Sequence, residues 1–238
     1  MNIVDFVPPD LTVLLTAGLV LLSFLTSALT ASVGLGGGLV LLVVLASFLP
    51  PLVVLPVHGV VQFGSNFGRA SLFRQYIDWS ITGYFLVGSI LGVIIAGRIF
   101  VALPADVLRA ILGLFVLSSI WTPNLRPSNI TLPGFLGVGA VTSFASIFVG
   151  GTGPLVSAFL SPENMGRKNW VATHAICMTA QHGLKGVIFG FLGFQFLPWL
   201  PTLIAMILFG FLGTVAGRRI LNRLPEKLFK QLFRVIMT

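Results

Sequence analysis

Charged residues are scarce in this chain of 238 residues. Asp, Glu, Lys and Arg together make up 8% of the sequence, whereas 56% of it is hydrophobic and the mean hydropathy is +1.03. In a soluble domain about a quarter of the residues are charged. The scarcity of charge excludes an ordinary soluble protein and indicates an integral membrane protein.

Cysteine is nearly absent as well, because Cys177 is the only one. A single thiol excludes an intrachain disulfide and any cysteine-ligated metal cluster. We interpret Cys177 as a small, buried apolar residue. We expect the protein to use no metal and no cofactor.

Acidic side chains are missing from the long apolar stretches. The carboxylates all fall in expected loops or at expected helix ends, and they are Asp5, Asp10, Asp78, Asp106, Glu163 and Glu226. Proton pumps and cation transporters commonly carry Asp or Glu within a membrane span. A cationic substrate would therefore find no counter-charge in this chain.

Basic residues outnumber acidic ones, and the net charge is +8. They stand at the ends of apolar stretches, as the positive-inside rule describes, so the charge does not indicate a nucleic-acid partner. We expect the loop with Arg167 and Lys168 and the region from Arg218 onward to face the cytoplasm. The first ten residues contain no Lys or Arg. We therefore interpret the first apolar stretch as a retained helix that starts outside, not as a cleaved signal peptide.

Several apolar stretches are long enough to cross a bilayer, which takes about 20 residues in a helix. Examples are residues 11–31, 79–99, 132–149 and 202–216. They predict an all-α, polytopic membrane protein whose outer surface faces lipid.

The second half of the chain repeats the first. Gly34 recurs as Gly150 and His58 as His174, each 116 residues later. Towards the C-terminus the shift grows to 121, which indicates a small insertion within residues 192–201. The pattern predicts two homologous helical repeats, which we expect to be inverted relative to each other.

The repeats cover residues 8–121 and 132–238, and a polar, proline-containing linker at residues 122–131 joins them. Each repeat contains one apolar segment that is too short to span, at residues 38–49 and 154–160. We expect these two segments to be half-helices, each entered through a glycine-rich loop.

Each repeat also contains a helix with a stripe of polar side chains. The spacing of four, seven and eleven residues from the first member places the stripe on one helix face. The stripes are His58, Gln62, Ser65 and Arg69, then His174, Met178, Gln181 and Lys185, with Asn66 and His182 beside them. Polar stripes in membrane helices face the bundle interior or a wet cavity.

A cation ends each stripe, at Arg69 and at Lys185. Placing Lys or Arg at the centre of a bilayer costs about 2.5–3.5 kcal/mol, and a bound anion would offset that cost. Other interpretations stay open at this point. Arg69 could snorkel to an interface beside Arg74, the histidines could pack between helices, and the amides and hydroxyls could form interhelical hydrogen bonds.

The glycine-rich loops at residues 34–38 and 150–153 directly precede the short segments. They could allow close helix packing, or their amides could bind an anion at the N-terminus of the half-helix that follows. Their duplication beside a duplicated cationic stripe favours a binding site between the repeats. They are not nucleotide-binding loops, because no Gly-Lys-Ser/Thr follows.

The order and spacing of these motifs resemble the sulfite exporter TauE/SafE family, also called the toluenesulfonate uptake permease family. The residues that carry the resemblance are the motif at 34–38, the polar helix up to Arg69, then Arg74, Asp78 and Trp79, and Gly88, Gly92 and Gly97 followed by Leu103, Pro104 and Arg109. The resemblance covers nearly the whole chain.

The resemblance implies a secondary transporter in the bacterial cytoplasmic membrane for sulfur oxyanions or small organosulfonates, such as sulfite and sulfoacetate. The expected partners are the small anion, the lipid bilayer and a coupling proton or sodium ion, and a homodimer is left open. The glycine loops and polar helices would form the site. Its expected residues are Gly36, Gly37, Gly38, His58, Gln62, Ser65, Asn66, Arg69, Gly151, Thr152, Gly153, His174, Gln181, His182 and Lys185.

Two other functions fit parts of the pattern. An anion channel would use the same basic stripes to line a pore. A membrane-embedded hydrolase would use Ser65 as nucleophile with His174 or His182, and Asn66 as oxyanion donor. Because a single nucleophile does not need two matching cationic stripes, we do not expect an enzyme.

Overall fold

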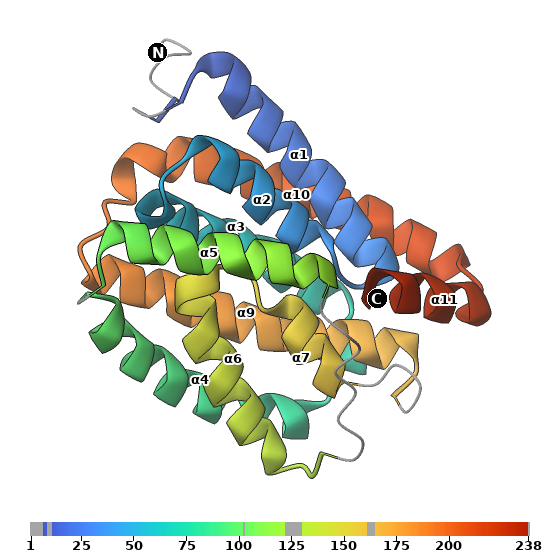
Figure 1. Cartoon of the computed structure of the whole chain (residues 1–238). Coiled ribbons are helices and arrows are strands. Elements are labelled where there is room, and N and C mark those ends of the chain that lie inside the picture. The colour runs from blue at the N-terminus through green and yellow to red at the C-terminus, as the bar shows by residue number, and fades with distance from the viewer. Residues whose placement is uncertain (1–6, 9–10, 102, 122–129, 161–164, 238) are drawn as a thin grey trace.

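A computed structural model describes residues 7–8, 11–101, 103–121, 130–160 and 165–237 of the chain. Within these ranges the chain forms helices and turns and no β-strand, in agreement with the predicted all-α class (Figure 1). The order is α1 (Val13–Val33), α2 (Gly37–Phe48), α3 (Pro51–Leu72), η2 (Arg74–Tyr76), α4 (Trp79–Phe100), α5 (Ala105–Trp121), α6 (Gly134–Val149), α7 (Gly153–Phe159), α9 (Arg167–Phe191), η3 (Leu197–Trp199), α10 (Leu200–Arg223) and α11 (Glu226–Met237).

Among the described residues, three helical segments are long and apolar enough to cross a membrane: α1, α4 and Leu197–Arg223. They confirm the spans predicted at residues 11–31, 79–99 and 202–216, and the last of them is longer than predicted. The span predicted at residues 132–149 is wrong in length, because α6 has only 16 residues. Leu132 and Pro133 stand in the turn that precedes it.

The half-helices lie where the glycine loops predict them. Gly34 adopts φ 101° and Gly36 adopts φ 99°, a backbone conformation that glycine adopts without a steric penalty. These residues end α1 and start α2. Gly150 adopts φ 86° between α6 and α7, so a left-handed glycine separates long helix from half-helix in both places.

Helices α3 and α9 pack against each other in the middle of the molecule, and two close helix pairs flank them, α1 with α10 and α4 with α6 (Figure 1). Glycines set the short distance within each flanking pair. A Cβ on Gly213 would lie 2.1 Å from the carbonyl oxygen of Phe24, and a Cβ on Gly92 would lie 2.1 Å from that of Ala140. Only glycine lets the backbones approach this closely.

Some predictions fall on parts of the chain that the structure does not describe. Residues 122–129 of the predicted linker lie outside the described residues, and so do most of the first ten residues and Ser161-Pro162. Of the carboxylates, Asp78 caps the N-terminus of α4, and Asp106 and Glu226 lie in the first turns of α5 and α11. These three confirm the prediction that acidic residues stay at helix ends.

Candidate functional site

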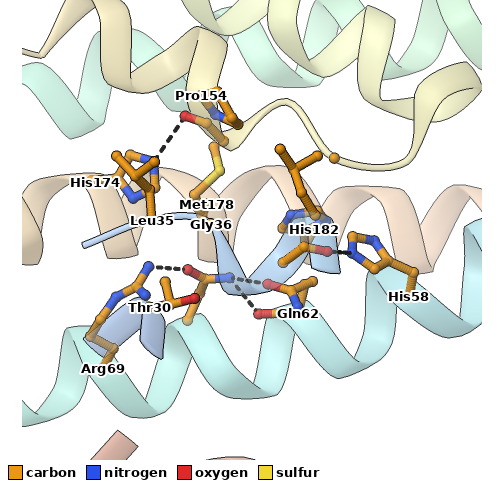
Figure 2. Close-up of a pocket in the computed structure, with 15 residues that line it drawn as sticks. Thr30, Leu35, Gly36, His58, Gln62, Arg69, Pro154, His174, Met178 and His182 are labelled. Carbon is orange, nitrogen blue, oxygen red and sulfur yellow. Dashed lines mark hydrogen bonds between the residues drawn. The ribbon is translucent and has the colours of Figure 1, made fainter. Parts of the chain in front are cut away.

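A small cavity of about 40 Å³ lies where the two glycine loops meet α3 and α9 (Figure 2). It is lined by Thr30, Leu35, Gly36, Gly38, Leu39, His58, Gln62, Asn66, Arg69, Gly151, Gly153, Pro154, His174, Met178 and His182. Its wall therefore combines both half-helix loops with the polar faces of the two central helices.

A histidine ties each central helix to one half-helix. His58 Nε2 on α3 donates to the carbonyl oxygen of Gly38 at 2.9 Å, and His174 Nε2 on α9 donates to that of Gly153 at 3.1 Å. Because a carbonyl oxygen only accepts hydrogen bonds, Nε2 carries the proton in both rings. The two bonds fix the position of the loops against the central helices.

The stripe on α3 is connected by hydrogen bonds. Asn66 Nδ2 donates to the backbone oxygen of Gln62 at 2.7 Å and to its Oε1 at 3.3 Å. Arg69 Nη2 in turn donates to Asn66 Oδ1. The amides thereby hold the guanidinium in place at the cavity wall (Figure 2).

Arg69 is only 1% exposed, and its Nε has no hydrogen-bond partner among the described residues. The snorkelling interpretation is therefore wrong. The ion pairs within the described residues, Arg109 with Asp106 and Arg167 with Glu226, do not involve it. A buried cation without a carboxylate carries a large desolvation cost, which a bound anion would offset.

Lys185 is fully buried, but it does not line the cavity. Its Nζ donates to the carbonyl oxygens of Ser146 at 2.9 Å and Gly150 at 3.0 Å. These carbonyls belong to the C-terminal end of α6, where backbone oxygens lack helical partners and the helix dipole favours a cation. The structure thus gives Lys185 a helix-capping position, and its predicted contact with an anion stays a prediction.

Ten of the fifteen predicted site residues line the cavity: Gly36, Gly38, His58, Gln62, Asn66, Arg69, Gly151, Gly153, His174 and His182. Lys185 and four others lie behind its wall. A Cβ on Gly37 would lie 1.9 Å from the Thr26 carbonyl oxygen, so Gly37 serves close packing. Ser65 Oγ lies 2.9 Å from Ser27 Oγ.

Gln181 and Thr152 also serve as hydrogen-bonded supports. Gln181 Nε2 donates to Thr152 Oγ1 at 2.7 Å, and Ser143 Oγ donates to Gln181 Oε1 at 3.4 Å. Interhelical hydrogen bonding, one of the interpretations left open, thus applies to Ser65 and Gln181. Ser65 pairs with a serine and not with a histidine, so the geometry of a hydrolase nucleophile is not formed.

Sequence reasoning missed five lining residues: Thr30, Leu35, Leu39, Pro154 and Met178. Met178 stands on the predicted stripe of α9, four residues after His174. Its position on that helix face was enough to predict that it lines the site, although its side chain is apolar. Thr30 lines the cavity from α1, where Ser23, Thr26, Ser27 and Thr30 recur at helical spacing. This stripe of hydroxyl residues is the signal that could have found it.

The cavity is not a metal site in the part of the chain that the structure describes. No group of three His, Cys, Asp or Glu side chains there is placed to hold a metal ion. Three histidines line the cavity and form no ion pair with the carboxylates that the structure describes, so its chemistry is that of hydrogen-bond donors and acceptors around one guanidinium.

Apolar helices long enough to cross a membrane, around a cation-bearing cavity, are typical of a membrane transport protein, and the comparisons with known proteins agree. The model of the sulfite exporter TauE/SafE family matches residues 19–238, which is nearly the whole chain. The chain belongs to the sulfite exporter TauE/SafE family. It is a membrane transporter family and not an enzyme family. No curated protein and no solved structure matches the chain.

Proposed function

We propose that this protein is a secondary transporter that moves sulfur oxyanions or small organosulfonates, such as sulfite and sulfoacetate, across the bacterial cytoplasmic membrane. One observation carries the proposal. The buried guanidinium of Arg69 lines an internal cavity and has no carboxylate partner among the described residues. A transported anion would supply the missing negative charge.

The size of the cavity supports a small anion. A buried water needs about 10–15 Å³ of such volume, so a cavity of about 40 Å³ accommodates roughly three water-sized groups. An ion of a few heavy atoms, such as sulfite, matches this space. A larger sulfonate would require the surrounding helices to move apart.

The first half-helix supports anion binding more strongly than the second. In α2 the first amides have no helical acceptors, and Gly36 and Gly38 line the cavity. A helix N-terminus with free amides attracts anions. In α7 the helix has only seven residues and Pro154 has no N–H to offer. We therefore place the anion between Arg69 and the start of α2.

The two flanking helix pairs each join the two halves at equivalent positions, which supports an inverted repeat of residues 8–121 and 132–238. Phe24 and Ala140 are 116 residues apart, and Gly92 and Gly213 are 121 apart, the two shifts of the sequence repeat. Each glycine packs on the residue of the opposite half. Rocking of one half against the other would open the cavity to each side in turn, as in other transporters with inverted repeats.

The direction of the chain in the membrane follows from the basic residues. Lys168 lies over the Tyr76 ring and Arg218 over the Phe73 ring, so basic residues from α9 and α10 gather at the same end of the bundle. We place this end in the cytoplasm, because positive residues are retained on that side.

Uptake of labelled sulfite by proteoliposomes that contain the full chain tests the proposal. A carrier coupled to an ion gradient accumulates sulfite above the external concentration when a proton or sodium gradient is imposed, and accumulation stops when an ionophore removes that gradient. Protein-free liposomes are the control. Uptake that only equalises the two concentrations under every gradient would favour the channel, and no uptake of sulfite or of any sulfonate would contradict the proposal.

A further inference from the structure

The end of the cavity that holds Arg69 also holds His174, which reaches it from the opposite central helix (Figure 2). His174 donates through Nε2 to the carbonyl oxygen of Gly153, so the neutral ring has its lone pair at Nδ1. This Nδ1 is buried and has no partner among the described residues. A buried acceptor without a donor costs free energy, which a suitable ligand would recover.

The ring of His174 is held in this orientation. Trp170 stacks on it with ring centroids 5.3 Å apart and an angle of 15° between the planes. Trp170 itself donates from Nε1 to the Leu160 carbonyl oxygen at 2.7 Å, and it packs so closely on Gly34 that a Cβ there would lie 2.1 Å from the indole. Trp170 thus fixes the plane of the ring, and the bond from Nε2 to the Gly153 carbonyl oxygen fixes which edge carries Nδ1.

The charge of the surroundings favours the neutral ring. His174 and Arg69 are close enough to interact electrostatically, and a second proton on the ring would add a positive charge beside an unpaired guanidinium. The ion pairs within the described residues include neither group, and Asp78, which packs on α9 at Thr173, does not line the cavity. This end of the cavity therefore offers one positive charge and one hydrogen-bond acceptor.

We propose that the site selects singly charged oxyanions that carry a hydrogen-bond donor, with His174 as the residue that determines this specificity. One oxygen of the anion would accept from Arg69, and an O–H group of the same anion would donate to His174 Nδ1. Hydrogensulfite has both groups, whereas a fully deprotonated dianion would direct lone pairs at Nδ1. The inference rests on the proposed function, because it assigns the transported anion to this cavity. It also narrows that function to hydrogensulfite, because sulfoacetate is a dianion without an O–H group.

The Nδ1 atoms of His58 and His182 are likewise buried without a partner among the described residues, and both rings line the cavity. The position relative to Arg69 distinguishes the three rings. His174 lies at the end of the cavity that holds Arg69 (Figure 2), whereas His58 lies beside the Gly150 carbonyl with Lys185 close by. The anion-facing role therefore falls to His174.

Two anions of the same charge and similar shape isolate the effect of the O–H donor on binding. Glycolate and propionate differ by one O–H group in place of one methyl group. Their binding to the purified full chain in detergent is measured by titration calorimetry. We expect glycolate to bind about tenfold more tightly, the effect of one buried hydrogen bond to an otherwise unpaired acceptor. Equal affinities, tighter binding of propionate, or no binding of glycolate would overturn the inference.

His174→Gln tests the assigned residue, because the glutamine amide can still donate to Gly153 while no acceptor remains at the position of Nδ1. We expect the glycolate preference to fall to about one while propionate affinity stays unchanged. His58→Gln makes the same change away from Arg69. A preference that is kept in His174→Gln, or that is lost only in His58→Gln, would overturn the role of His174. Sulfite uptake by proteoliposomes made from the same purified protein separates the failures. Uptake without a glycolate preference overturns the inference alone, and loss of both overturns the proposed function.

Discussion

Two buried cations distinguish the two halves at the scale of single residues. The proposed repeat makes Arg69 and Lys185 equivalent, yet Lys185 donates to two carbonyl oxygens of α6, whereas Arg69 lines the cavity with Nε unpartnered. One cation therefore completes a helix end, and the other remains available to a ligand.

Lys185→Met tests this division, because methionine keeps the length of the side chain and removes the donor. We expect the free energy of unfolding to fall by about 1–3 kcal/mol, since the carbonyls of Ser146 and Gly150 lose their partner in a buried place. The KM for sulfite should stay unchanged in the folded protein. Thermal unfolding in detergent and the concentration dependence of uptake measure the two effects.

Lys227→Met, at an exposed position on α11, is the control and should leave both quantities unchanged. A raised KM with unaltered stability in Lys185→Met would show instead that Lys185 contacts the anion, as the sequence alone predicts.

The spacing of polar residues on α3 and α9 was enough to predict most of the cavity wall. His58, Gln62 and Arg69 share a face because they recur at helical intervals. The partner of Lys185 could not be predicted, because the end of α6 meets α9 only through tertiary packing. Gln62 lines the cavity, whereas Gln181 is bonded to Thr152 behind its wall. The residue type is the same, so only the tertiary packing distinguishes the two.

At the scale of helices, α4 and α10 run in opposite directions across the molecule (Figure 1). The same reversal relates α1 to α6. Opposite directions of equivalent helices are what an inverted repeat requires. The helices that follow, α5 and α11, consequently begin at opposite ends of the bundle (Figure 1).

Cysteine labelling tests the inversion. Asp106 and Lys227 are exposed, stand 121 residues apart and open α5 and α11. In a Cys177→Ala background, we expect a membrane-impermeant thiol reagent to label Asp106→Cys from outside intact cells and Lys227→Cys only in inverted vesicles. The untouched Cys177→Ala chain is the control for background labelling. Labelling of both cysteines from the same side would mean that the repeats are parallel.

Helix lengths were harder to predict than helix positions. The glycine loops indicated both half-helices, and the structure places α2 and α7 within one residue of the predicted starts. The predicted span at residues 132–149 was too long, because apolar composition continues into the turn at Leu132 and Pro133 before α6 begins. Hydrophobicity alone does not distinguish a helix from the apolar turn that precedes it.

At the scale of the whole molecule, the cavity lies between the central helices and has a volume of about 40 Å³. Two histidine bonds, from His58 to Gly38 and from His174 to Gly153, join the central helices to the half-helix loops. In the proposed transport cycle, these contacts would have to change when the halves rock. The flanking pairs α1 with α10 and α4 with α6 are packed through glycines and would move as units.

The central claim is that Arg69 holds the transported anion, and gradient-driven uptake of labelled sulfite by Arg69→Gln tests it most directly. Glutamine keeps a donor beside Asn66 and removes the charge. Arg109→Gln is the matched control, because Arg109 is exposed, pairs with Asp106 and lies away from the cavity. We predict that the KM of Arg69→Gln rises at least about tenfold, the loss of one charge-assisted hydrogen bond, while Arg109→Gln transports like the wild type. Unchanged sulfite uptake by folded Arg69→Gln would contradict the account.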